Sequence, residues 1–105
     1  AAETLIVCGR LRVDMAGRRT WVDGAPVRLT AREWAVLECL VLRAGKIVSK
    51  EQIISVVAGR DGEVSQGVLN VHMSRLRRKL ETAGVRIHTV RGLGYCLEKN
   101  AQLPD

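Results

Sequence analysis

The chain has 105 residues, of which 47% are hydrophobic and 27% are charged. This length and composition are typical of one globular domain and exclude a disordered chain. Its 17 lysines and arginines outnumber its 11 aspartates and glutamates, for a net charge of +6 at pH 7. This excess favours a polyanionic partner, because binding to phosphates releases condensed counterions. The sequence contains no signal segment and no apolar run long enough to span a bilayer. We therefore expect a soluble, cytoplasmic domain that is a fragment of a longer protein.

Three cysteines are spread widely along the chain, at Cys8, Cys39 and Cys96. None forms a C-x-x-C pair, so their spacing indicates neither a disulfide framework nor a zinc cluster. We expect free thiols that fill small apolar sites in a reducing cytosol, and we expect no metal and no cofactor.

The first thirty residues predict short strands joined by tight turns. Asp23-Gly24 is a strong hairpin signal, and Ala16-Gly17 marks another turn. Pro26 restricts its segment to an edge strand or a strand start. The pattern predicts a four-stranded antiparallel meander with strands near residues 5–8, 10–14, 19–22 and 26–29.

From Thr30 onward the apolar residues follow a helical period. Thr30-Ala31-Arg32-Glu33 is a capping box, in which the Thr hydroxyl and the Glu carboxylate satisfy backbone N–H groups reciprocally. The first helix is stopped by Gly45, and a second capping box at residues 49–52 opens a shorter helix that ends at Gly59. Between these helices Ile47-Val48 is β-prone.

A third helix is predicted at about residues 64–81, after a polar, glycine-containing loop at 58–63. Val85–Val90 and Tyr95–Leu97 then form a hairpin around a turn at 91–94, and residues 98–105 are expected to be a frayed tail. The expected fold class is α+β.

The third helix has two chemically distinct faces at about 100° per residue. An apolar stripe faces the core and consists of Leu69, Met73, Leu76 and Leu80. The opposite side carries Gly67, Val68, Val71, Ser74, Arg75 and Arg78, flanked by Asn70, His72, Arg77 and Lys79. Such a face suits a DNA major groove, where Arg pairs with guanine and Val contacts a thymine methyl. The alternative is a merely solvated cationic face, which does not need two exposed valines beside its arginines.

The hairpin is also basic, with Arg86 and His88 on its first strand and Arg91 at its turn. An Arg at the tip of a β-ribbon can enter a minor groove, where negative potential is concentrated. Gly92 and Gly94 permit positive φ and close approach to a sugar–phosphate backbone. Alternatively, these two glycines only allow a tight turn.

Four segments in this order resemble the winged helix-turn-helix effector domain of OmpR/PhoB-type two-component response regulators. They are residues 29–34 (LTAREW), 45–51 (GKIVSKE), 71–80 (VHMSRLRRKL) and 89–95 (TVRGLGY). The resemblance covers residues 5–98, leaving 99–105 as a tail. It implies a four-stranded sheet, three helices, a C-terminal hairpin wing and sequence-specific binding of double-stranded DNA for transcription regulation.

The resemblance also implies roles for individual residues. Arg75 is the principal base contact, Val71 an apolar base contact, and Arg91 reaches into the minor groove. On the exposed face of the third helix, Val68 is a further base contact and Ser74 a contact to the DNA backbone. At the hairpin turn, Gly92 is a second contact to the DNA backbone. The remaining backbone contacts are His72, Arg77, Arg78 and Thr89. A loop that resembles a polymerase-contacting surface comprises Gly59, Arg60, Asp61, Gly62 and Glu63.

Further partners follow from the same resemblance. A homodimer on tandem half-sites, RNA polymerase, and a sensor histidine kinase are expected. The kinase acts on a separate, N-terminal receiver domain that these 105 residues do not include. Phosphorylation therefore takes place outside this chain.

Several positions depart from the family pattern. Ala58 stands where Trp is usual and Lys50 where Arg is common, while Gly67 and Val68 replace a polar or basic residue and Thr. Gly67 lowers helix propensity by up to about 1 kcal/mol relative to Ala. Phosphate contact in this first turn is thereby left to backbone N–H groups.

Other functional classes fit the sequence less well. An enzyme is not predicted, because His72 and His88 lack partners at catalytic or metal-ligand spacing. A winged helix that binds protein or RNA is the main alternative, against which Arg75 and Arg78 on the exposed face argue. A DNA-binding domain attached to a membrane-anchored regulator also fits, since the difference lies outside these residues.

Overall fold

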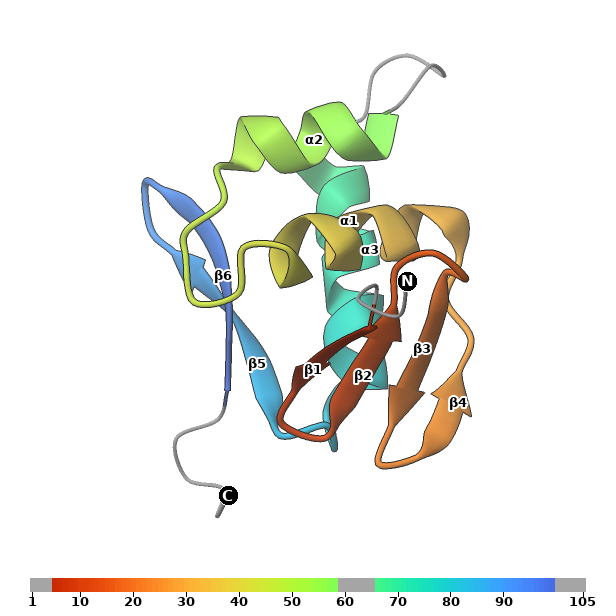
Figure 1. The fold of residues 1–105 in the computed structure, drawn as a ribbon. Helices are drawn as coiled ribbons and strands as arrows, with labels where there is room; N and C mark the ends of the chain where they lie inside the picture. The colour runs from red at the N-terminus through yellow and green to blue at the C-terminus, as the bar shows by residue number, and fades with distance from the viewer. Residues whose placement is uncertain (1–4, 59–65, 100–105) are drawn as a thin grey trace.

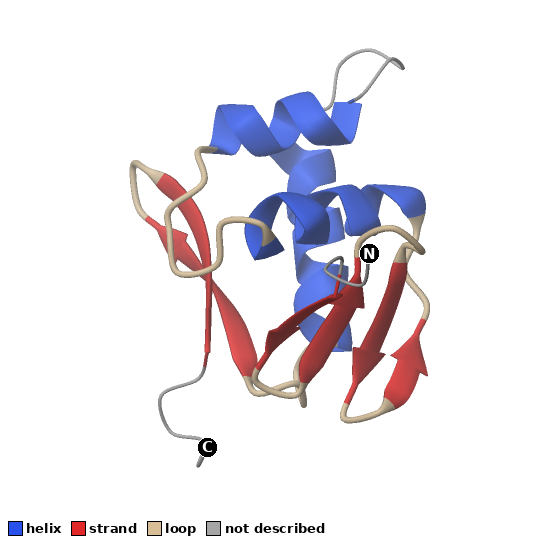
Figure 2. Cartoon of the chain, viewed as in Figure 1, coloured by secondary structure: helices blue, strands red, loops and turns tan. Residues whose placement is uncertain are grey.

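The computed structural model describes residues 5–58 and 66–99, which form two strand units around three helices (Figure 1). The elements follow in the order β1 Leu5–Cys8, β2 Leu11–Asp14, β3 Arg19–Val22, β4 Ala25–Val27, α1 Ala31–Val41, α2 Lys50–Ala58, α3 Gln66–Lys79, β5 Val85–Val90 and β6 Gly94–Lys99. Figure 2 shows the four-stranded meander and the two-stranded hairpin as separate units that flank the helices. The predicted α+β winged-helix architecture is confirmed.

The meander has the strand order β1-β2-β3-β4 and is antiparallel throughout. Leu11 and Val13 on β2 are fully buried whereas Arg12 is exposed, so one face of the sheet packs on the core. Asp23 and Gly24 both have positive φ, at 53° and 82°. This tight turn pairs Val22 with Ala25, and β4 therefore begins one residue earlier than expected.

Helix α1 begins with the predicted capping box. Thr30 Oγ1 accepts from the Glu33 N–H at 3.2 Å, and Glu33 Oε1 accepts from the Thr30 N–H at 3.0 Å. At the start of α2, Ser49 Oγ accepts from the Gln52 N–H at 3.1 Å. The sequence therefore places both helix starts correctly.

Helix α3 ends at Lys79, two residues earlier than predicted. Beyond it the backbone tightens, and the N–H groups of Glu81 and Ala83 donate three residues back, to Arg78 and Leu80. The tightened segment meets the β1–β2 turn, where the Arg10 N–H donates to Ala83 O at 2.7 Å and the Arg10 guanidinium donates twice to Thr82 O. The contact with the meander thus ends α3 at Lys79, although the helical pattern of the sequence continues to residue 81.

The hairpin is longer than predicted. Glu98 pairs with Arg86 and Lys99 with Val85, so the expectation that Glu98 and Lys99 belong to a frayed tail is wrong. Their pairing partners, near the start of β5, are held in place by the packing of Val85 and Ile87 into the core. Residues 100–105, the rest of the predicted tail, lie outside the described residues.

A short bridge joins the wing to the link between α1 and α2. Val48 and Tyr95 exchange two backbone hydrogen bonds, of 2.8 and 2.9 Å, as the β-prone Ile47-Val48 segment suggested. Gly94 lies beside this bridge with φ 149°, and a Cβ built there would be 2.1 Å from Val48 O. The absence of a side chain at Gly94 is what allows the two segments to approach.

Gly94→Ala is expected to destabilise the domain by at least about 3 kcal/mol, because the new methyl group collides with backbone that cannot move aside cheaply. Gly92→Ala is the matched control. Gly92 also has positive φ, but no atom of the described residues lies within 4 Å of its added Cβ, so strain alone costs about 1–2 kcal/mol. Urea unfolding of both variants measures the difference, and equal losses would contradict the close-approach explanation.

Candidate nucleic-acid interface

The exposed face of α3 gathers the side chains that the sequence predicts for a major groove. Leu69, Met73, Leu76 and Leu80 are at most 2% exposed, as expected for the core stripe. On the other side Val68 and Val71 are 37% and 45% exposed, and Gly67, Ser74, Arg75 and Arg78 are exposed as well. An open hollow of about 490 Å³ on this face is lined by Asn70, Val71, Ser74, Arg75, Arg78 and Lys79. Polar and cationic groups thus surround an apolar patch.

His72 lies at the edge of this face rather than on it. Its side chain is half-buried, and its Nδ1 is buried without a hydrogen-bond partner among the described residues. It is also near enough to Glu33 for its charge to favour the ionised carboxylate. Part of the ring therefore faces α1, and at most its outer edge is available to a phosphate.

Lys79 anchors the C-terminal end of α3 to the start of α1. Its Nζ lies 2.5 Å from Glu33 Oε1 and 2.9 Å from Arg28 O, and Glu33 is only 1% exposed. Burial alone raises the pKa of Glu33. The Lys79 hydrogen bond, the Thr30 N–H and the charges of Lys79 and His72 outweigh it, and the net pKa is lowered. The capping box reveals Glu33 in the sequence, but no local signal reveals a partner 46 residues away.

Glu33→Gln is expected to destabilise the domain by about 1–3 kcal/mol at pH 7, because Lys79 loses a charged acceptor. Since the folded-state pKa is lowered, the contribution of Glu33 is complete above its unfolded-state pKa and is lost as pH falls through the folded-state pKa. Denaturant unfolding from pH 7 to pH 3 therefore measures a gap between wild type and variant that closes on the acid side. A gap independent of pH would contradict this role for the ionised carboxylate.

Arg77 joins α3 to the β5–β6 hairpin, which is the predicted wing. Its Nε donates to Ile87 O at 3.1 Å, and its Nη2 donates to Thr89 Oγ1 at 2.9 Å. The sequence predicts both Arg77 and Thr89 as phosphate contacts, and the structure places them against each other. Arg77 thus fixes the angle between α3 and β5, whatever else it contacts.

The cations of the wing differ in position, because Arg91 lies at its turn whereas Arg86 and Lys99 lie near its other end. Arg86 Nη2 donates to His88 Nδ1 at 3.0 Å, and His88 Nε2 contacts Glu98 Oε1. Arg86 and Glu98 pair on the half of the hairpin away from the turn, with His88 near its middle, and the Glu98 carboxylate offsets the charge of Arg86. Arg91 and Gly92 are exposed at the turn itself, which makes Arg91 the cation best placed to project from it.

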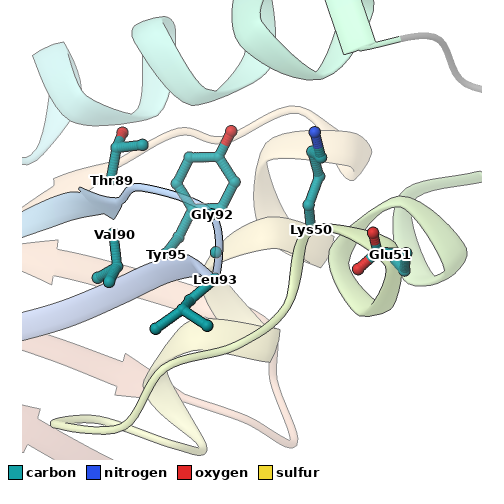
Figure 3. A pocket seen from close by; sticks show the side chains of 8 residues that line it. Lys50, Glu51, Thr89, Val90, Gly92, Leu93 and Tyr95 are labelled. Atoms are coloured by element: carbon teal, nitrogen blue, oxygen red, sulfur yellow. The ribbon is translucent and has the colours of Figure 1, made fainter.

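A second hollow, of about 220 Å³, separates the wing from the start of α2. It is lined by Lys50, Glu51, Thr89, Val90, Gly92, Leu93, Gly94 and Tyr95. In Figure 3 the polar ends of Lys50, Thr89 and Tyr95 point toward α3, whereas Val90 and Leu93 point away. In the sequence Lys50 stands out only as a departure from the usual Arg, and no site role is predicted for Tyr95. The Val48–Tyr95 bridge, which brings Lys50 beside the wing, is a long-range contact without a local signature.

The cysteines, the metal-ligating residues and the loop at 59–63 are the remaining features for which the sequence makes a prediction. Cys8, Cys39 and Cys96 are free thiols, and burial raises the pKa of each. Within residues 5–58 and 66–99 there is no cluster of three or more metal-ligating side chains and no helix long and apolar enough to cross a membrane. The predicted polymerase-contacting residues, Gly59 to Glu63, lie outside the described residues.

Arg77→Met is expected to cost about 1 kcal/mol of folding stability, because two hydrogen bonds between α3 and β5 are lost. Thr89→Val removes only one of them and should cost less. A residue that serves only as a phosphate contact would behave differently, leaving stability unchanged and lowering the salt dependence of DNA binding by about one counterion. Urea unfolding and salt titration of both variants separate these two roles.

The fold and the exposed basic helix beside a hairpin define a winged helix-turn-helix domain. Residues 24–97 match the family model described as "Transcriptional regulatory protein, C terminal". The chain therefore belongs to this family, the winged-helix DNA-binding domains of OmpR/PhoB-type response regulators, a family of regulators rather than of enzymes.

Relatives and solved structures agree with this assignment. The chain is 38% identical to the transcriptional regulatory protein BasR of Escherichia coli over 95% of its own length and 44% of that protein. It is 38% identical to the response regulator PmrA of Pseudomonas aeruginosa, covering 91% and 42%. The chain thus spans less than half the length of these relatives.

Among solved structures, the DNA-binding domain of CpxR from E. coli superimposes with a TM-score of 0.78 at 26% identity, covering 92% of this chain and 98% of that one. The Klebsiella pneumoniae RstA DNA-binding domain, solved in complex with RstA box, gives 0.76 at 28% identity and covers 91% and 98%.

Proposed function

We propose that this domain binds specific double-stranded DNA sites, with α3 in the major groove and the β5–β6 turn at the adjacent minor groove. The observation that carries the proposal is the exposed face of α3, where Arg75 and Arg78 flank Val71 opposite a fully buried stripe. Arg75 is exposed on this face and is the principal base contact, since Arg pairs with both acceptors of guanine. Val71, with Val68 one turn earlier, offers apolar contact to a thymine methyl.

The groups around this face, both cationic and uncharged, contact the phosphates. Arg78 and Ser74 share the α3 hollow, and Thr89 and Gly92 line the hollow beneath the wing. Arg91, exposed at the wing turn, enters the minor groove. The edge of His72 and any side-chain hydrogen of Arg77 not used toward β5 complete the phosphate contacts. The RstA DNA-binding domain, which was solved in complex with RstA box, supports DNA as the partner.

The relatives support a role in the cell. We propose that the domain is the output unit of a cytoplasmic response regulator, activated when a sensor kinase phosphorylates a receiver domain outside this chain. Two copies bind tandem half-sites about 10–10.5 base pairs apart, and the segment 59–63 contacts RNA polymerase. The match to response regulators such as PmrA supports this assignment.

Arg75→Ala is expected to weaken specific binding by about 1–3 kcal/mol and to relax selectivity at one base position. Arg78→Ala is the matched control, because loss of a phosphate contact weakens binding evenly across sequences and lowers the salt slope by about one. Selection from random duplexes at a fixed salt concentration measures both effects. Unchanged selectivity in the Arg75 variant would contradict its assignment as a base contact, and no enrichment with the wild type would contradict the proposed function.

A further inference from the structure

The exposed face of α3 changes in character along its length. Before Arg75, the middle of this face presents four small residues, namely Gly67, Val68, Val71 and Ser74. Val68 is 37% exposed and Val71 45% exposed. At about 100° per residue, Val71 lies opposite the buried stripe and thus at the centre of the face. Two β-branched apolar side chains therefore occupy a surface that is predicted to meet base edges.

A valine can distinguish bases only by apolar contact, because its side chain neither donates nor accepts a hydrogen bond. In the major groove the base pairs present donors and acceptors, and the one apolar substituent among them is the C5 methyl group of thymine. Cytosine carries a hydrogen at the same ring position, and 5-methylcytosine carries a methyl group there. A valine that contacts this position therefore detects the methyl group itself, whichever of the two pyrimidines bears it.

The spacing and the size of the two valines suit neighbouring base pairs. Val68 and Val71 are three residues apart, which is about 4.5 Å along the helix axis, and base pairs follow one another at about 3.4 Å. Gly67 and Ser74 are small, so they do not hold the helix away from the base edges. Val71 also lines the α3 hollow of about 490 Å³. A polar base edge packed against either valine would lose hydration without gaining a hydrogen bond, so contact with a methyl group is favoured.

From these observations we propose that the domain detects the C5 methyl group of pyrimidines at two neighbouring positions of its DNA site, and hence the methylation of cytosine there. The inference rests on the proposed function, because it requires α3 in the major groove. It goes beyond a contact with thymine, since a site that carries cytosine at either position binds more tightly once that cytosine is methylated. Methylation of the DNA then changes the occupancy of a site without any change in the protein.

The first test removes single methyl groups from the DNA. In the duplex that the wild-type chain selects, each thymine is replaced in turn by deoxyuridine, which lacks only the C5 methyl group, and Kd is measured at a fixed salt concentration. Replacement at two neighbouring base pairs should weaken binding by about threefold each, the effect expected for one buried methyl group. Fewer than two responsive positions in a selected site would overturn this inference and leave the proposed function intact. If the wild type selects no site, both fail.

Two variants assign each responsive position to one valine. Val71→Ala should abolish the effect of deoxyuridine at one position and Val68→Ala at its neighbour, because the protein side of each contact is removed. The fold should tolerate both changes, since both side chains are exposed. Ser74→Ala is the matched control on the same face, and it should leave the ratio of thymine to deoxyuridine binding unchanged at both positions. Ratios that persist in both valine variants, or that vanish in all three variants, would overturn the assignment.

The second test measures the response to cytosine methylation directly. At each responsive position the T·A pair is replaced by a C·G pair, with and without a methyl group at C5 of the cytosine. The wild type should bind the methylated duplex about threefold more tightly than the unmethylated one, and the matching alanine variant should bind the two equally. Equal binding of the two duplexes by the wild type, or weaker binding of the methylated one, would overturn the inference.

Discussion

The buried contact between Lys79 and Glu33 holds α3, the proposed recognition helix, in place. One carboxylate, 1% exposed, receives both the Thr30 N–H that caps α1 and the ammonium group of Lys79 from the last turn of α3. The same ammonium donates to Arg28 O, just before α1. Rotation of α3 about its axis would leave a buried charge unpaired. The exposed face with Arg75 therefore has one defined orientation relative to the rest of the domain.

The wing depends on two further contacts with the body of the domain. Arg77 fixes β5 against α3, and the Val48–Tyr95 bridge fixes β6 against the link between α1 and α2. A hairpin of two strands is only marginally stable alone, so these contacts and the buried Ile87 and Leu97 hold it in position. The direction of Arg91 is thus set by residues distant from the turn.

Local patterns in the sequence predicted the elements well, because capping boxes, the Asp23-Gly24 turn and the apolar stripe of α3 are formed by neighbouring residues. These local patterns gave the wrong boundary where contact with a distant segment determines where a helix or strand ends. Helix α3 ends early because residues 82–83 bind Arg10, and β6 continues to Lys99 because β5 is there to pair with it. The site shows the same division. The exposed face followed from helical spacing alone, whereas the partners of Arg77 and Lys79 lie on other elements.

The proposed DNA contacts lie mainly on the middle and C-terminal turns of α3. Gly67 offers no side chain to the groove, and Val68 offers only apolar surface. Arg75 and Arg78 both lie within the last five residues of α3, next to the anchored Lys79. A base-contacting group loses the least conformational entropy on binding where its backbone is already fixed. We therefore expect the arginines beside the buried ion pair to compensate for Gly67 and Val68, which carry no polar side chain. We expect selectivity to depend on Arg75 more than on any residue before Val71.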